Sequence, residues 1–440
     1  MNSPLYNCRG RGLRALAPLV VLLLAAPALE AQTPAPPQAG PIALTGGTVH
    51  TVSGEVIPGG TVVFEDGVIT AVGREVPVPA GARTIDVSGR EVYPGFVDAY
   101  SAMGLSEIGA VDVTLDLNEL GPFNPNVQAH VAVNPESRHI GVARSNGVLV
   151  TVSSPSGGLV SGMAAAMMME GWTWEEMTLQ PDVGLIVNWP SPLASPWGGG
   201  QRDPEARYTE EIAELREHFA SARAYAQARR AEAAGQAPAV RTDPRLEAMI
   251  PVLEGTVPVI VAANELRQLQ DAVDWAEREG VRLILRGGRD AHLLADHLAA
   301  RQVPVLLTSV LDSPSRAWEA YDEEYTLPGR LHRAGVQIAI TGGAAPAYAN
   351  RLPFEAGAAV GFGLPQEAAL RAVTLNPARF LGIDDRVGSI AVGRDATLMI
   401  TTGNPLEYES TVEQVFIQGR EVDMGDAQRT FYEKYRQRLR

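Results

Sequence analysis

The chain has almost no lysine and almost no cysteine, and each shortage excludes a class of chemistry. Among its 36 basic residues, Lys434 near the C-terminus is the only lysine. The body of the chain therefore offers no lysine to form a Schiff base, to assist a serine nucleophile or to bridge two metal ions as a carbamate. The single cysteine, Cys8, precedes an apolar run at 13–28, so we expect neither a disulfide nor a thiolate metal ligand after that run.

Basic charge is also in deficit. The chain has 36 Lys and Arg against 51 Asp and Glu, a formal net charge of −15. Residues 1–31 contain three arginines and one glutamate, a net +2, so the rest of the chain carries −17. This balance argues against nucleic acid or an anionic lipid surface as a partner.

The first 31 residues have the pattern of a secretory signal. Arg9, Arg11 and Arg14 accompany the apolar run 13–28, and small residues at Ala28 and Ala31 offer cleavage sites. The run is too short to span a membrane. We expect 1–31 to be a signal peptide, the mature protein to be exported to a bacterial periplasm, and no membrane span. A Pro-rich linker at 32–41 follows, and 425–440 form a C-terminal tail.

Two separated stretches alternate apolar and polar residues in short runs, at 42–92 and again at 383–424. Glycine pairs and Asp66-Gly67 punctuate the first stretch as hairpin turns. We predict that both stretches together build one small β-sandwich domain.

Between them, residues 93–382 alternate buried strands with helices, which is typical of βα units on a parallel sheet. The expected strands are 93–99, 148–153, 160–169, 183–188, 257–264, 281–288, 303–309 and 336–343. Eight such units predict a mixed α/β fold with a (β/α)8 barrel of the TIM type. A long helix at 204–234, capped by Asp203 and carrying one apolar stripe, is expected to serve packing.

Several motifs in a fixed order carry a resemblance to a known family. They are Glu65-Asp-Gly-Val-Ile-Thr-Ala-Val-Gly73, Tyr93-Pro-Gly-Phe-Val-Asp-Ala99, Ala369-Leu-Arg-Ala-Val-Thr-Leu-Asn-Pro-Ala-Arg379, Gly388-Ser-Ile-Ala-Val-Gly-Arg-Asp-Ala396 and Val415-Phe-Ile-Gln-Gly-Arg-Glu-Val422. With them the chain resembles the amidohydrolase superfamily, in the branch of imidazolonepropionase and other cyclic amidohydrolases. The resemblance implies a hydrolase of non-peptide C–N bonds, with zinc or another divalent metal at the C-terminal mouth of the barrel.

The resemblance also implies where the metal ligands would lie, and those positions hold other residues. The His-x-His pair of the first strand is Tyr100 and Ala102, the histidines of the fifth and sixth strands are Ala262 and Arg286, and the aspartate of the eighth is Gly342. A divalent metal needs three or four N, O or S ligands. We therefore predict no metal cofactor and name no catalytic residue.

Polar residues at the expected strand ends form the candidate ligand-binding set: Tyr100, Asn188, Asn264, Arg286 and Thr341. The Arg286 guanidinium would supply the positive charge that a metal supplies in the family, which suits a small anionic or amide ligand. An ion pair of Arg286 with Asp290 is the alternative. His130 and His139 follow the first strand, so a role near the mouth stays open for them. Glu107, Asp112, Asp116 and Glu119 offer either paired carboxylates for acid–base work or a solvated loop.

Two functions follow. The first is a catalytically impaired binding or partner subunit, acting beside an intact amidohydrolase paralogue or in a homo-oligomer. The alternative is an active hydrolase of cyclic amides that uses a rebuilt or metal-free site. The fold alone does not decide between them.

Overall fold

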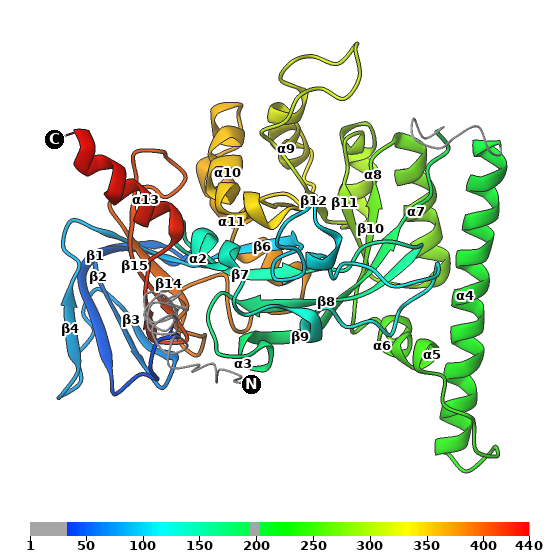
Figure 1. The fold of residues 1–440 in the computed structure, drawn as a ribbon, viewed down its shortest axis with the longest axis horizontal. Helices are drawn as coiled ribbons and strands as arrows, with labels where there is room; N and C mark the ends of the chain where they lie inside the picture. The colour runs from blue at the N-terminus through cyan, green and yellow to red at the C-terminus, as the bar shows by residue number, and fades with distance from the viewer. Residues whose placement is uncertain (1–32, 194–202, 440) are drawn as a thin grey trace, which may run out of the picture. The chain divides into compact units, whose positions relative to one another are not determined.

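Two eight-stranded sheets organise the protein (Figure 1). The computed structural model describes residues 33–193 and 203–439. The predicted signal peptide, 1–31, lies outside the described residues.

The first sheet joins strands from both ends of the chain. Its strands are β1 (Ile42–His50), β2 (Val56–Glu65), β3 (Val68–Gly73), β4 (Arg83–Asp86), β5 (Glu91–Pro94), β14 (Leu398–Thr401), β15 (Val412–Ile417) and β16 (Arg420–Val422). They run in the order β16-β15-β14-β5-β1-β2-β3, and β4 also pairs with β1. The antiparallel pair β14–β5 sets Leu398 opposite Pro94 and so links the two stretches. The rings of Phe64 and Phe416 pack edge to face in the hydrophobic core of this sheet, with centroids 5.1 Å apart.

The turn between β2 and β3 is the one that its sequence predicts. Asp66 has φ 50° and Gly67 has φ 80°, and the flanking Glu65 and Val68 are paired. Two positive φ values are those of a type I′ turn, in which Asp-Gly is a preferred pair.

The second sheet forms a nearly closed barrel. Its strands follow chain order: β6 (Phe96–Ser101), β7 (Val148–Ser153), β8 (Val160–Met168), β9 (Thr178–Asn188), β10 (Val259–Ala263), β11 (Leu283–Gly287), β12 (Val305–Leu307) and β13 (Ile338–Ile340). At the seam between β13 and β6, the Ala102 amide donates to the Ala344 carbonyl at 2.9 Å, and the Gly342 amide donates to the Asp98 carboxylate at 3.2 Å. The fold is thus mixed α/β, as predicted, with an eight-stranded barrel sheet.

One strand departs from the expected repeat. β8 runs antiparallel to both β7 and β9, whereas β6–β7, β9–β10, β10–β11, β11–β12 and β12–β13 are parallel. The connection 154–159 is too short for the crossover that a parallel neighbour needs, and Gly157 and Gly158 turn the chain with φ of 83° and 63°. The interpretation of 160–169 as a parallel βα strand is therefore wrong.

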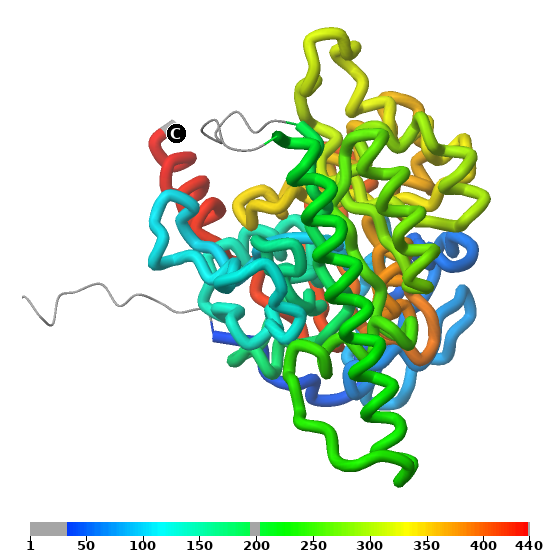
Figure 2. The backbone as a smooth tube through the Cα atoms, turned by 90° about the vertical axis from the view of Figure 1, so that its right-hand side faces the viewer, coloured from blue at the N-terminus to red at the C-terminus, as the bar shows by residue number. Residues whose placement is uncertain are grey.

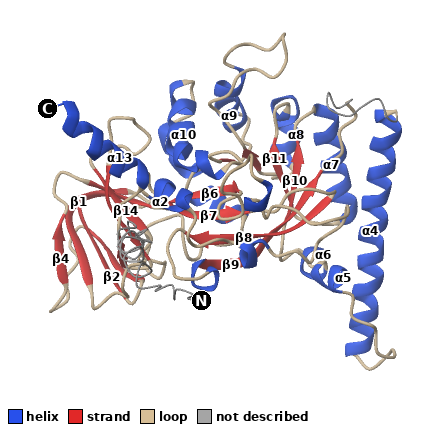
Figure 3. Ribbon diagram, viewed as in Figure 1, coloured by secondary structure: helices blue, strands red, loops and turns tan. Residues whose placement is uncertain are grey.

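Helices cover the outside of the barrel, as α7 and α8 do beside β10 and β11 (Figure 3). The helices of the described residues are α2 (Arg138–Arg144), α3 (Trp174–Met177), α4 (Pro204–Ala233), α5 (Pro244–Ala248), α6 (Ile250–Leu253), α7 (Leu266–Glu279), α8 (Ala295–Ala300), α9 (Glu323–Arg333), α10 (Leu352–Gly361), α11 (Gln366–Ala372), α12 (Leu375–Phe380) and α13 (Ala427–Arg436). Short 3-10 turns are η1 (Asp112–Thr114), η2 (Ala129–Ala132), η3 (Ala291–Leu294), η4 (Pro346–Arg351) and η5 (Gln437–Leu439). Among the described residues, no helix is both long enough and apolar enough to cross a membrane.

Figure 2 shows the long helix α4 in front of the barrel. The helix begins and packs as its sequence predicts. The Asp203 carboxylate accepts a hydrogen bond from the Glu205 amide at 3.1 Å, which caps the helix. Its stripe is buried, and Phe219 meets Trp275 of α7 edge to face with ring centroids 4.9 Å apart. The buried apolar stripe of α4 therefore serves packing, as predicted.

The described part of the predicted linker is attached to the body of the protein. The Ala35 amide donates to the buried Glu170 carboxylate at 2.6 Å, and the Gln38 amide group donates to the Phe64 carbonyl at 2.9 Å. Glu170 also forms a buried ion pair with Arg144. These contacts tie the segment to both the barrel and the first sheet.

Candidate functional site at the barrel mouth

A cation–π pair lies at the centre of the mouth. Tyr100 is the penultimate residue of β6, and Arg286 is near the end of β11. The guanidinium carbon of Arg286 is 4.0 Å from the centroid of the Tyr100 ring. These strands are not neighbours in the sheet, so the two side chains meet across the barrel interior. Such a contact favours the charged guanidinium.

Arg286 makes no hydrogen bond or ion pair to any residue that the structure describes, and its Nε is buried without a partner. Burial lowers the pKa of Arg286, while the Tyr100 hydroxyl acts in the opposite direction. A guanidinium nevertheless stays protonated in proteins. The mouth thus contains a partly buried positive charge with free donors.

The alternative of an Arg286–Asp290 ion pair is wrong. Both carboxylate oxygens of Asp290 bind the guanidinium of Arg316, at 2.7 and 2.9 Å. The Leu266 amide donates a further hydrogen bond to Asp290 at 2.9 Å. Both oxygens of the Asp290 carboxylate therefore bind Arg316 rather than Arg286.

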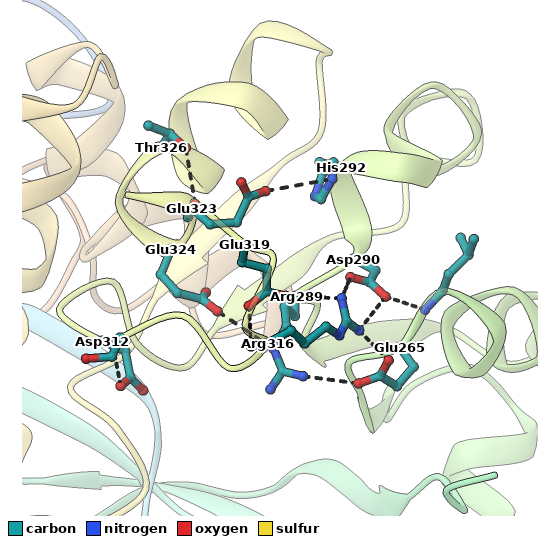
Figure 4. A network of polar contacts seen from close by, with 12 residues as sticks. Glu265, Arg289, Asp290, His292, Asp312, Arg316, Glu319, Glu323, Glu324 and Thr326 are labelled. Carbon is teal, nitrogen blue, oxygen red and sulfur yellow. Dashed lines mark hydrogen bonds and ion pairs between the residues drawn. The ribbon is translucent and has the colours of Figure 1, made fainter. Parts of the chain in front are cut away.

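Arg316 ties together the loops that follow β10, β11 and β12 (Figure 4). Besides Asp290, it binds Glu265 and, at 3.1 Å, Glu319. Arg289 joins the same group through Glu265 at 3.1 Å. These carboxylates raise the pKa of Arg316 well above its ordinary value. We interpret this cluster as a structural clamp on the rim.

Asp98 lies two residues before Tyr100 on β6. It is completely buried; Oδ1 accepts from the Gly342 amide, and Oδ2 has no partner among the described residues. Burial raises the pKa of Asp98 to about 7, and the charge of Glu355 acts in the same direction. Thr151, opposite Asp98 on β7, also has a buried hydroxyl without a partner. We did not single out Asp98 from the sequence, although a carboxylate within an apolar strand was the available signal.

A cavity of about 310 Å³ opens beside Tyr100. Its apolar wall includes Leu117 and residues 344–347, and its polar wall includes Glu107 and His139. The ring Nε2 of His139 lies 3.0 Å from the Glu107 carbonyl oxygen. His139, whose role was left open, therefore lies at the mouth, as does Glu107 of the four loop carboxylates. His130 instead packs against Trp174, with ring centroids 5.3 Å apart, and burial lowers its pKa.

The other candidate residues are held by local contacts. The Asn188 side chain donates to the Gly158 carbonyl at 2.9 Å and to the Ser161 hydroxyl at 3.0 Å. The Thr341 hydroxyl accepts from the Gly343 amide at 3.2 Å. Asn264 lies against Gly287, where an added Cβ would be 2.4 Å from its Oδ1. Tyr100 and Arg286 are thus the pair that the fold brings into contact.

The residues at the expected ligand positions do not fit a divalent metal. Ala102, Ala262 and Gly342 have no side-chain donor, and the Gly342 amide already binds Asp98. In the ranges 33–193 and 203–439 there is no group of three or more His, Cys, Asp or Glu that could hold a metal ion. The guanidinium of Arg286 would also repel a metal cation nearby.

The fold of this chain is similar to that of solved structures. An amidohydrolase from Thermotoga maritima has a similar structure, with a TM-score of 0.77 and 26% sequence identity over 87% of this chain and 99% of that one. "Amidohydrolase tasK" of Hapsidospora irregularis is 26% identical over 395 residues, which cover 82% of this chain and 39% of that protein. The adenine deaminase of Shewanella halifaxensis is 32% identical over 102 residues, which cover 23% of this chain and 17% of the deaminase. The chain thus spans well under half the length of these two curated relatives.

Residues 328–422 match the model of the amidohydrolase family. This match and the similar structure confirm the resemblance to the amidohydrolase superfamily that the motifs predicted.

Proposed function

We propose that this protein is a catalytically impaired amidohydrolase-superfamily member that binds a small anionic or amide ligand at the barrel mouth. The observation that supports the proposal is the Arg286 guanidinium, which faces Tyr100 at 4.0 Å and has no acidic partner among the described residues. Tyr100 and Arg286 are the proposed primary contacts, and Asn188, Asn264 and Thr341 are proposed secondary ones.

The chemistry of this pair suits a carboxylate. A planar guanidinium presents parallel N–H donors that match the two oxygens of a carboxylate. Its partial burial reduces competition from water and so strengthens the contact. The apolar wall of the cavity beside Tyr100 would accept the body of the same ligand.

A second candidate is an active hydrolase of cyclic amides with a rebuilt, metal-free site. It is favoured by the relatives, which are named as an amidohydrolase and a deaminase. Asp98 of β6, whose pKa burial raises to about 7, is the proposed acid–base group of this candidate. In such a hydrolysis Arg286 would bind the amide oxygen and water would add to the carbonyl carbon while Asp98 takes a proton from it. That proton would pass to the amide nitrogen as the C–N bond breaks.

Two measurements separate the candidates. Elemental mass spectrometry of the untagged protein, reloaded with Zn²⁺, Mn²⁺ or Fe²⁺, should find no bound metal; near one equivalent would contradict the impaired-site proposal. The second measurement is isothermal titration calorimetry with benzoate and N-acetylglycine. It should detect binding that Arg286→Ala abolishes and Arg286→Lys weakens. Arg282→Ala, at an exposed arginine just before the same strand, is the matched control and should bind normally. Unchanged binding by Arg286→Ala would contradict the proposed contact, and turnover of a cyclic amide such as dihydrouracil would favour the hydrolase.

We also propose the finer architecture and the location. The barrel would comprise 93–382 as a (β/α)8-type unit with β8 reversed, and 42–92 with 383–424 would form a small β-sandwich. The proposed branch is that of imidazolonepropionase and the cyclic amidohydrolases, and the proposed partner is an intact paralogue or a second copy. Residues 1–31 would direct export to the periplasm, which N-terminal sequencing of the protein from a periplasmic extract would test.

A further inference from the structure

The C-terminal helix α13 projects from the body of the protein. Its first turn is anchored: Asp426 caps it through the Gln428 and Arg429 amides at 2.7 and 2.9 Å, and the Arg429 guanidinium donates to the Ser145 carbonyl at 3.1 Å. Beyond that turn, every residue from 431 to 438 is exposed, on all sides of the helix. A helix this short is marginal in water without packing. The described part of the chain gives its outer turns no such packing.

The composition of these outer turns is opposite to that of the body. Residues 431–438 contain three basic residues and one glutamate, in a chain whose net charge is −15. Phe431, Tyr432 and Tyr435 are 55%, 63% and 57% exposed on the same helix. Exposed aromatic residues among basic ones are typical of a contact surface for an acidic, partly apolar partner.

A surface of that kind exists elsewhere on the chain. The loop 104–121, here called the acidic loop, contains four carboxylates and no Lys or Arg: Glu107, Asp112, Asp116 and Glu119. It also exposes large apolar side chains, with Val113 at 94% and Leu120 at 91%. The loop has a defined shape, because the Asp116 amide donates to the Leu105 carbonyl at 2.8 Å and Ser106 bridges Leu115. It also forms one wall of the cavity beside Tyr100.

We propose that α13 docks onto the acidic loop of a second copy of this chain, so that two copies exchange their C-terminal helices. Charge complementarity and matching apolar side chains select this partner. Among the described residues, no hydrogen bond or ion pair joins 431–438 to the acidic loop of the same copy, so both surfaces are free for the exchange. A reciprocal pair uses both contacts at once, which doubles the buried area and closes the assembly as a dimer. Each docked helix then covers the cavity wall of the other copy.

The test is sedimentation of the full chain with charge-reversed variants. One variant reverses the helix (Lys434→Glu, Arg436→Glu, Arg438→Glu) and another reverses the loop (Asp112→Lys, Asp116→Lys, Glu119→Lys). All six side chains are exposed, so folding should be preserved. Arg241→Glu with Arg245→Glu, at exposed arginines outside both surfaces, is the matched control.

We expect the wild-type chain and the control to form dimers at low salt that dissociate as salt rises. Each reversal alone should weaken the dimer at least tenfold, because like charges then face each other. Mixing the two variants should restore it, since both contacts of the mixed dimer again pair opposite charges; docking within one chain would give no such rescue.

Three results would overturn the proposal. A wild-type chain that stays monomeric at 100 µM and low salt has no such contact. An oligomer that is unaffected by both reversals uses another surface. Binding of monomeric chain to phosphatidylglycerol vesicles, lost on helix reversal, would assign α13 to an anionic membrane instead.

Discussion

Arg286 and Tyr100 come from strands that are not neighbours in the barrel sheet, and the guanidinium carbon of Arg286 lies 4.0 Å from the centroid of the Tyr100 ring. The ring covers one face of a cation that has no acidic partner in the described chain. The positive charge is therefore retained at the mouth without being neutralised, which is the condition for binding an anion.

The first prediction separates the ring from the hydroxyl of Tyr100. Tyr100→Ala removes a buried aromatic side chain and the cation–π contact, and we expect a loss of about 3–5 kcal/mol in the free energy of unfolding. Tyr100→Phe retains the ring and should cost less than about 1 kcal/mol. Urea denaturation followed by circular dichroism measures both variants. Equal losses would show that the hydroxyl, rather than the ring, supports the mouth.

The second prediction concerns pH and Asp98. Its pKa rises from 3.8 to about 7 on folding because the carboxyl is buried. The folded state therefore binds the proton more tightly, so this stability is fully present below about pH 4 and is lost as pH rises through 7. A shift of three pKa units corresponds to a change of about 4 kcal/mol in the free energy of unfolding. Asp98→Asn should flatten the decline in the free energy of unfolding between pH 5 and pH 8, measured by urea titration at each pH. A variant that keeps the wild-type slope would exclude Asp98 as its source.

The third prediction addresses Glu355 of α10. This buried carboxylate accepts hydrogen bonds from the Val310 and Leu311 amides at 2.6 and 2.7 Å, just after β12. Glu355→Ala leaves one buried and one partly buried amide unpaired and should cost about 2–5 kcal/mol in the free energy of unfolding. Glu355→Gln keeps an acceptor oxygen and avoids a buried charge, so it should lose less than half as much. Thermal unfolding of both variants provides the measurement, and equal losses would contradict an acceptor role.

The fourth prediction tests the clamp at the rim. Arg316→Ala leaves Glu265, Asp290 and Glu319 facing one another without the shared cation. We expect faster proteolysis of the loop after β12, by about tenfold, and a loss of about 2–4 kcal/mol in the free energy of unfolding. Arg316→Lys should rescue little, since one ammonium cannot make the paired contacts of a planar guanidinium. Full rescue by lysine would show that only the charge is needed.

Local signals in the sequence predicted local structure well. Asp203 and Pro204 mark the start of α4, and Asp66-Gly67 marks a tight hairpin, because a cap or a turn depends on a few adjacent residues. The strand periodicity located β8 but not its direction. The direction of β8 depends on the length of the connection between β7 and β8. The apolar pattern of the strand contains no information on that length.

The site was only partly predictable. The family motifs located Tyr100 and Arg286, but their contact depends on barrel closure, which joins strands that are far apart in the sequence. Asp290 is the acidic residue nearest to Arg286 along the chain, yet in the fold it forms its ion pair with Arg316. The unpaired Oδ2 of Asp98 likewise depends on what surrounds it in three dimensions.

The pairing of β14 with β5 has a consequence for how the protein is made. β5 is synthesised early, and its sheet neighbour β14 appears only after the whole barrel has left the ribosome. Until then, one edge of the N-terminal strands has exposed amide and carbonyl groups that can pair with another nascent chain. The first sheet can therefore be completed only after residues 398–422 have been made, and truncation before residue 398 should yield aggregates rather than a smaller folded protein.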